Sequence, residues 1–130
     1  MLRIAIPSVD DRGLDSMVSA HFGRAPFYTI VSVDEGRIGE VSVLRNPFVE
    51  HSPGQIPRFL KEQGVKVIIA YGMGWRAKEL FSSLGIEVVV GAEGRIKQVV
   101  ESFIKGTLKS SEDWRRKPEF RHHEHHGCSD

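Results

Sequence analysis

The feature that most constrains the fold is a pattern that occurs twice in the second half of the chain: an apolar run, a glycine turn and an amphipathic segment. The first copy joins residues 65–70 to a predicted helix over 75–84, and the second joins 86–90 to a predicted helix that begins at Ile96. Nearly continuous apolar runs of this length are typical of strands covered on both faces. Two successive strand–helix units predict parallel strands joined by right-handed crossovers.

The first half of the chain predicts strands of a different kind. Residues 2–6 form a short apolar run closed by Pro7, which indicates a buried strand, and the polar residues 8–16 that follow predict a long loop without an element. Residues 27–34 and 38–44 are rich in β-branched and aromatic residues and are separated by a glycine-bearing turn. They predict an antiparallel hairpin.

A helix start signal follows the hairpin, with Ser52 as N-cap, Pro53 at the first helical position and Gln55 three residues after the cap. The elements together predict an α/β domain over residues 1–108, with a mixed five-stranded sheet and helices packed on it. The apolar periodicity stops after this domain, so we expect residues 109–130 to be a flexible tail.

Composition and charge exclude several classes of partner. A formal net charge of +1 gives no global field toward nucleic acid, and no apolar run reaches the roughly 18 residues of a membrane span. The apolar start at residues 1–7 is too short for a signal peptide, and the single cysteine, Cys128, excludes an intrachain disulfide. We therefore expect a cytoplasmic protein with no nucleic-acid or membrane partner.

Three segments follow strands that we expect to be parallel: the loop that carries His21, residues 71–74 and residues 91–94. Ligands of open α/β sheets bind beyond the carboxyl ends of the strands, so these loops should lie on one edge. The candidate binding residues are His21, Phe22, Gly23, Arg24, Gly72, Met73, Gly74, Gly91 and Gly94.

The residue types suggest what could bind there. The imidazole of His21 can ligate a transition metal, donate to an anion or act as a base, and Arg24 adds a fixed cation. Glycines at 72 and 74 let the backbone approach a ligand, with the Met73 thioether between them, although glycines also serve tight turns. For Phe22, core packing is favoured over stacking on a ligand.

Two other regions contain residues that can ligate metals: the acidic residues after the first strand, and the histidine-rich end of the chain. Asp10, Asp11 and Asp15 match no calcium loop, which favours turn chemistry over a cation site. The terminus gathers ligands that suit nickel, zinc, copper or iron, with a purification tag as the alternative explanation. These candidate metal ligands are His122, His123, His125, His126 and Cys128.

Five motifs in the same order resemble the dinitrogenase iron-molybdenum cofactor biosynthesis family over about residues 1–108. They are Met1-Leu2-Arg3-Ile4-Ala5-Ile6-Pro7, Gly13-Leu14-Asp15-Ser16, Ser19-Ala20-His21-Phe22-Gly23-Arg24-Ala25, Gly72-Met73-Gly74 and Gly85-Ile86-Glu87-Val88. The resemblance implies a three-layer α/β/α fold of ribonuclease H-like topology. The family commonly continues its glycine loop with a small residue or proline, whereas this chain has Trp75, whose bulky ring could narrow the site.

The resemblance also implies a function: non-enzymatic binding and transfer of an iron–sulfur or iron–molybdenum cluster, with His21 as candidate ligand. A cluster donor or acceptor protein would be the partner, and a homodimer is possible. Two alternatives stay open. One is a divalent-ion storage or regulatory module that acts through the histidine-rich tail. The other is a ribonuclease H-like nuclease, which is less favoured because residues 2–6 contain no carboxylate for a two-metal site.

Overall fold

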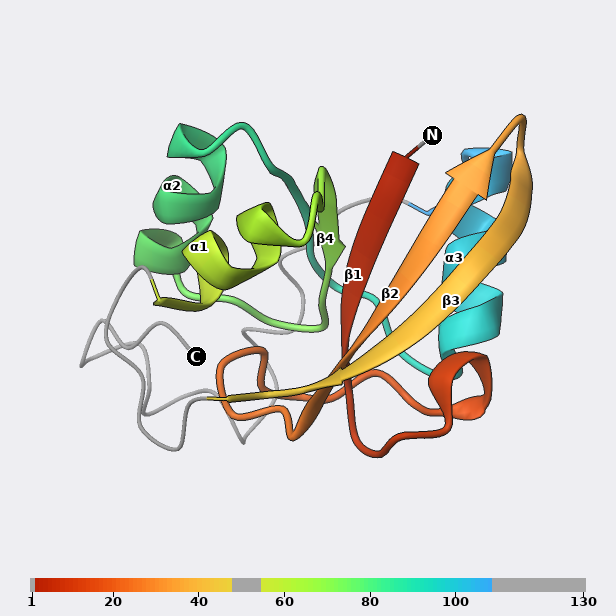
Figure 1. Cartoon of the computed structure of the whole chain (residues 1–130), viewed down its shortest axis with the longest axis horizontal. Helices are drawn as coiled ribbons and strands as arrows, with labels where there is room; N and C mark the ends of the chain where they lie inside the picture. The colour runs from red at the N-terminus through yellow and green to blue at the C-terminus, as the bar shows by residue number, and fades with distance from the viewer. Residues whose placement is uncertain (1, 48–54, 109–130) are drawn as a thin grey trace.

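The computed structural model describes residues 2–47 and 55–108, and it contains a five-stranded sheet in the order β3-β2-β1-β4-β5 (Figure 1). The strands are β1 (Leu2–Ser8), β2 (Phe27–Asp34), β3 (Arg37–Arg45), β4 (Val67–Ile69) and β5 (Glu87–Val89). Helices in the described ranges are α1 (Gln55–Glu62), α2 (Trp75–Ser83), α3 (Ile96–Lys105) and the short 3₁₀ helix η1 (Gly13–Asp15). The helix start signal at Ser52 and Pro53 and the predicted tail lie outside the described residues.

The pairing of the strands confirms the predicted mixed sheet. β2 pairs antiparallel with both β1 and β3, whereas β4 pairs parallel with β1 and β5. In the ranges that the structure describes, no helix is long and apolar enough to cross a bilayer.

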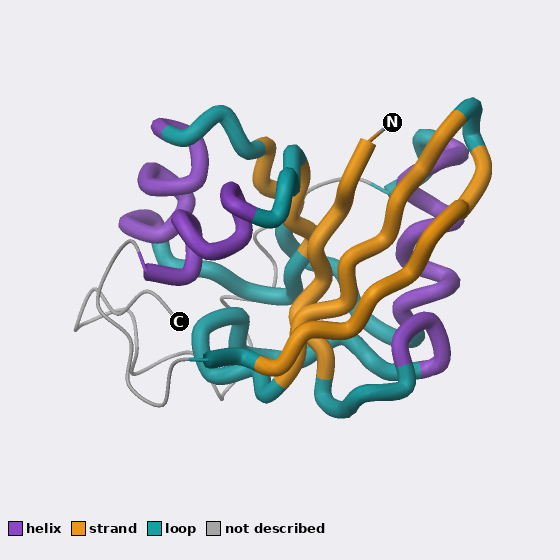
Figure 2. Tube along the Cα trace, viewed as in Figure 1, coloured by secondary structure: helices purple, strands orange, loops and turns teal. Residues whose placement is uncertain are grey.

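Helices cover both faces of the sheet, with α1 and α2 on one side and α3 on the other (Figure 2). Since successive side chains of a strand point to opposite faces, the strands supply two separate cores. One core lies under α1 and α2 and includes Ala5, Ile30, Leu60, Ile68 and Phe81; the other lies under α3 and includes Ile4, Val31, Ile69, Ile96 and Val100. The predicted three-layer α/β/α arrangement is confirmed.

β1 extends past the predicted strand 2–6 and runs through Pro7. It pairs with β2 over its whole length, but only two of its residues pair with β4. The carbonyl of Arg3 accepts a hydrogen bond at 2.9 Å from the backbone N–H of Lys66, the residue before β4. The direction of the backbone polar groups alternates along a strand, so those of Pro7, four residues later, also point toward the β4 side. The missing N–H of Pro7 thus lies beyond the end of the β4 pairing and removes no bond to β2.

β4 and β5 are shorter than the predicted strands 65–70 and 86–90, because each contributes only three residues to their shared ladder. The first residue of each predicted strand instead bonds back to the preceding helix. Val65 donates to a carbonyl of α1 at 3.2 Å, and Ile86 donates to a carbonyl of α2 at 2.9 Å. Val65 and Ile86 therefore complete the ends of α1 and α2. The apolar pattern predicted strands that are longer than the observed ones because it counted these two residues as strand residues.

The expectation that residues 8–16 contain no element is wrong, because η1 lies within them. Two backbone hydrogen bonds of 3.3 and 3.0 Å, each spanning three residues, form its single turn. Gly13 has φ +65°, and a Cβ there would lie 3.6 Å from the side chains of Val41 and Val43 on β3. A turn this short has no periodicity to recognise, and packing against β3 holds it in place.

Candidate functional site

Three loops meet at the carboxyl ends of β1, β4 and β5. The N–H of Gly91 donates to the carbonyl of Tyr71 at 2.8 Å, which joins the loop after β5 to the loop after β4. The N–H of Val18 donates to the carbonyl of Gly94 at 2.9 Å, which joins the loop after β1 to the loop after β5. The structure therefore brings together the segments that the sequence placed on one edge.

The loop that carries His21 and Arg24 begins at a turn fixed by Ser19. The Ser19 hydroxyl donates to the His21 carbonyl at 3.1 Å and accepts from the His21 N–H at 3.3 Å. The His21 side chain is partly buried, its Nδ1 atom is buried, and Arg24 is exposed. This loop thus presents an imidazole and a guanidinium three residues apart at the edge where the loops meet.

Tyr28 on β2 and Asn46, directly after β3, anchor the same loop. The hydroxyl of Tyr28 on β2 donates to the Phe22 carbonyl at 2.6 Å. The side-chain amide of Asn46 donates to the carbonyl of Ala25 at 2.9 Å and to that of Gly23 at 3.3 Å. In the sequence, Asn46 marks only the end of a predicted strand. Its role could have been found from the hairpin register, which pairs Phe27 with Arg45 and so places Asn46 beside the loop.

The side chains of Phe22 and Met73 lie in the core rather than at the ligand edge. Phe22 is 2% exposed, and its ring meets that of Phe81 edge to face at a centroid distance of 5.5 Å. The favoured core role of Phe22 is confirmed. The expected thioether contact from Met73 needs correction, because this side chain is fully buried in the cluster under α1 and α2.

The glycines of the site divide into two kinds. Gly91 and Gly94 have φ +93° and +98°, so the turns themselves require glycine. Gly74 has φ −66° and ψ 157°, an extended conformation open to any residue, and neither Gly23 nor Gly72 is among the described glycines with positive φ. At these positions the lack of a side chain, rather than backbone freedom, distinguishes glycine.

Trp75 begins α2 directly after the glycine loop and is 54% exposed. The guanidinium carbon of Arg76 lies 6.0 Å from the centroid of its ring, within the range of a cation–π contact. More than half of the surface of Trp75 is therefore exposed.

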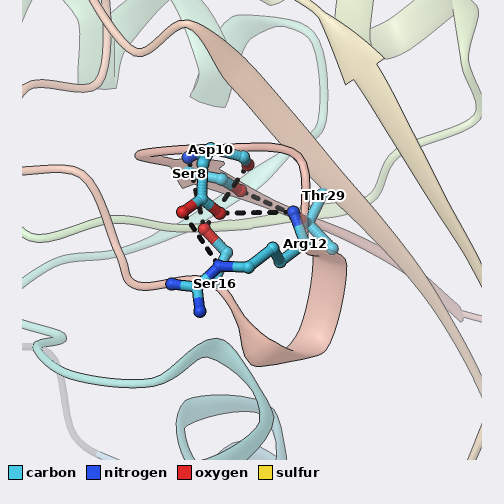
Figure 3. A network of polar contacts seen from close by, with 5 residues as sticks. All are labelled: Ser8, Asp10, Arg12, Ser16 and Thr29. Carbon is cyan, nitrogen blue, oxygen red and sulfur yellow. Dashed lines mark hydrogen bonds and ion pairs between the residues drawn. The ribbon is translucent and has the colours of Figure 1, made fainter.

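Asp10, two residues after β1, lies in a hydrogen-bonded turn (Figure 3). The carboxylate of Asp10 accepts from the Arg12 backbone N–H at 3.2 Å and from its Nε at 3.0 Å. Hydrogen bonding with Ser16 is the largest cause that lowers the pKa of Asp10 below its ordinary 3.8, followed by the contacts with Arg12. The buried hydroxyls of Ser8 and Thr29 lie 2.6 Å apart beside this turn. The turn chemistry expected for Asp10 is confirmed.

Within the described ranges 2–47 and 55–108, no group of three His, Cys, Asp or Glu side chains is placed to hold a metal ion. The described residues thus offer no carboxylate cluster of the kind that a two-metal nuclease uses. The tail ligands lie outside the described residues, and the metal site expected there stays a prediction; these are His122, His123, His125, His126 and Cys128.

Comparison with known proteins gives one family and several solved structures. The family model described as dinitrogenase iron-molybdenum cofactor matches residues 2–106. The crystal structure of PH0822 is 45% identical with a TM-score of 0.80, and the match covers 88% of this chain and 99% of that one. The apo form of the orange protein from Desulfovibrio gigas is 26% identical with a TM-score of 0.72, and the match covers 86% and 94%.

Two further proteins match over a similar span. A Thermotoga protein named for NifB is 30% identical with a TM-score of 0.70, and the match covers 85% of this chain and 93% of that one. An uncharacterized protein of Methanocaldococcus jannaschii is 29% identical over 115 residues, which are 86% of this chain and 93% of that protein. The similarity therefore extends over nearly the whole of each relative.

Proposed function

Because the chain belongs to the dinitrogenase iron-molybdenum cofactor family, we propose that it binds an iron–sulfur or iron–molybdenum type cluster and carries it between assembly partners without catalysing a reaction. The observation that carries this proposal is the position of the motif His21–Arg24. The family match includes it, and hydrogen bonds join its loop to residues 91–94, which are joined in turn to the loop that begins at Tyr71. The NifB name of one structural relative supports an accessory role in cofactor assembly.

The residues at this edge suit an anionic cluster. Since Nδ1 of His21 is buried, ligation would use Nε2. The exposed guanidinium of Arg24 and the backbone N–H groups of the glycine loops would offset negative charge on the cargo. The cluster donor and acceptor would be proteins that approach this same edge.

The donor set also suits release. The only cysteine in the sequence is Cys128, and the Met73 sulfur is buried in the core, so the described residues provide no thiolate, and Met17 is the exposed thioether among them. A cluster held by one imidazole, charge and backbone contacts would exchange more readily than one held by four thiolates. Ready exchange is what a carrier requires.

The test is anaerobic reconstitution of the full chain with an iron–sulfur cluster, measured by iron and sulfide content and by visible absorption. We expect His21→Ala to lose most of the cluster, whereas His51→Ala, a histidine outside the motif, keeps it. Equal uptake by wild type and His21→Ala would show that His21 is not the ligand and would refute the site proposed here.

A second candidate function rests on the four histidines and one cysteine between residues 122 and 128, which suit a divalent transition metal. In this alternative the tail stores or senses the ion and the folded domain is a partner platform. Truncation after Lys109 separates the two functions. Loss of all metal binding would favour the tail, and retained cluster uptake would favour the carrier.

A further inference from the structure

The two edges of the sheet differ in length. β5 forms one edge and has three residues, whereas β3 forms the other and has nine (Figure 1). A short edge strand gives another chain little to pair with, but a long one is a template for pairing unless charge, proline or a bulge protects it. β3 is therefore the edge that is long enough to pair with another strand.

The hydrogen bonds at the end of β3 show which backbone groups point away from the sheet. Asn46 directly follows β3, and its N–H donates at 2.9 Å to the carbonyl of Pro26, directly before β2. Since the direction of the backbone groups alternates along a strand, Leu44 and Ser42 also bond toward β2. The residues whose N–H and carbonyl groups point outward are the alternate ones: Val41, Val43 and Arg45.

These outward groups have no hydrogen-bond partner in the part of the chain that the structure describes. Within that part no strand lies beyond β3, and no backbone bond outside the sheet involves Val41, Val43 or Arg45. Each of these residues has one N–H and one carbonyl. Three donors and three acceptors therefore face outward along β3.

A bulge limits this edge on one side. The paired residues Val31 and Val33 of β2 enclose one residue, whereas their partners on β3 enclose two, Gly39 and Glu40. The bulge interrupts the ladder, so regular pairing on the outer side begins after it. Residues 41–44, which follow, contain no charge and no proline and include two β-branched valines. This part of the edge thus lacks the features that usually prevent pairing.

The outward groups are arranged symmetrically about Val43. If a second copy runs antiparallel along β3 with its own Val43 opposite this one, Val41 lies opposite the partner's Arg45 and Arg45 opposite the partner's Val41. Opposite residues of this kind exchange both hydrogen bonds, so all six outward groups of each copy find a partner. A shift of two residues in either direction would leave Val41 or Arg45 without one. The symmetric register also places arginine opposite valine, so no like charges face each other.

We propose that β3 is a homodimer interface, at which two copies of this chain join their sheets by antiparallel pairing of residues 41–45 across a two-fold axis at Val43. Such an interface uses the same surface on both copies. The antiparallel arrangement directs the carboxyl ends of the two β3 strands apart, so the loops that Asn46 anchors lie on opposite sides of the axis. The pairing depends on neither the cargo nor His21.

The first test is sedimentation equilibrium of the full chain with a reductant present, so that Cys128 forms no disulfide. We expect a monomer–dimer equilibrium for wild type. Val43→Pro removes the N–H at the axis from both copies and keeps the ladder with β2, because this N–H points outward. It should weaken association about tenfold or more. Val43→Thr, a β-branched control that keeps the N–H, should associate as wild type does.

Cysteine cross-linking in a Cys128→Ser background tests the register. Opposite residues of a hydrogen-bonded antiparallel pair have Cα atoms about 5.5 Å apart, within the range of a disulfide. Val43→Cys would face its own copy at the axis and should form a disulfide-linked dimer on mild oxidation. Val41→Cys is the control, because the proposed register offsets it from its copy by roughly 14 Å along the strands. It should stay largely monomeric on a non-reducing gel.

The inference is overturned if wild type remains a monomer at about 1 mM, or if a folded Val43→Pro variant associates as tightly as wild type. It is also overturned if Val41→Cys cross-links as readily as Val43→Cys, and this comparison decides the question if Val43→Pro does not fold. Circular dichroism shows whether each variant keeps the fold. A monomer that takes up the cluster through His21 would refute the dimer and leave the proposed function standing.

Discussion

Replacing Phe22 with leucine tests whether this aromatic member of the binding motif stabilises the core or contacts the cargo. The ring is 2% exposed and meets Phe81 at 5.5 Å with an interplanar angle of 68°, an edge-to-face geometry. Both rings belong to the core under α1 and α2. We therefore expect Phe22→Leu to lower the free energy of unfolding and to leave cluster capacity unchanged.

The structure sets the magnitude. A buried hydrophobic exchange of similar volume usually costs less than about 1.5 kcal/mol, and an edge-to-face aromatic pair contributes about 0.5–1.5 kcal/mol beyond area burial. We expect Phe22→Leu to cost about 1–2 kcal/mol on these grounds. Phe22→Ala would cost about 3–5 kcal/mol, a large part of the stability of a domain this size, so leucine is the better probe.

Urea unfolding followed by circular dichroism measures the effect, and a double-mutant cycle with Phe81→Leu isolates the ring pair. The expected coupling is about 0.5–1.5 kcal/mol. Phe103→Leu is the control, because Phe103 packs on the core under α3 and should show no coupling to Phe22. Wild-type stability combined with lost cluster uptake in Phe22→Leu would mean that the ring contacts the cargo, and the reasoning would fail.

Two other predictions concern the loops beside the site. The pKa of Asp10 is lowered in the folded protein, so its carboxylate adds stability above the unfolded pKa, which is lost as the pH falls through the folded value. Asp10→Asn should flatten the acid side of the stability curve below about pH 4, measured by urea unfolding against pH, and an unchanged slope would contradict this. Gly94→Ala should cost about 1–2 kcal/mol because φ is +98°, although a Cβ there meets nothing within 4 Å. Gly39→Ala is its control, since Gly39 lacks a positive φ, and equal losses of thermal stability in the two variants would rule out backbone strain as the cause.

The antiparallel and parallel parts of the sheet were predictable for different reasons. Residues 27–34 and 37–45 carry β-branched residues on either side of a glycine turn, and such a hairpin needs only local contacts. The strand–helix units after residue 65 have strong periodicity, which indicates element type but not where a ladder ends. The ends of β4 and β5 depend on which N–H groups the preceding helices bind, and that is a tertiary fact.

The candidate site shows the same division within a few residues. His21 and Arg24 stand out in the sequence because their chemistry does not suit a core, and the motif places them on a loop. Tyr28 and Asn46 carry no such signal, because a tyrosine in a strand and an asparagine at its end are ordinary residues. The pairing of β2 with β3 brings Asn46 to the loop, and Tyr28 on β2 bonds back to Phe22, six residues before it.

The sequence by itself determined the family, the class of fold, the order of the elements and the motif that carries the candidate ligand. These features follow from local patterns: apolar period, turn residues and a short string of unusual side chains. The tertiary structure decided that Met73 faces the core and which carbonyls of the loop are bonded, and it confirmed the core position expected for Phe22. Burial and hydrogen-bond partners depend on segments far apart in the chain, so no local pattern around residues 19–25 could specify them.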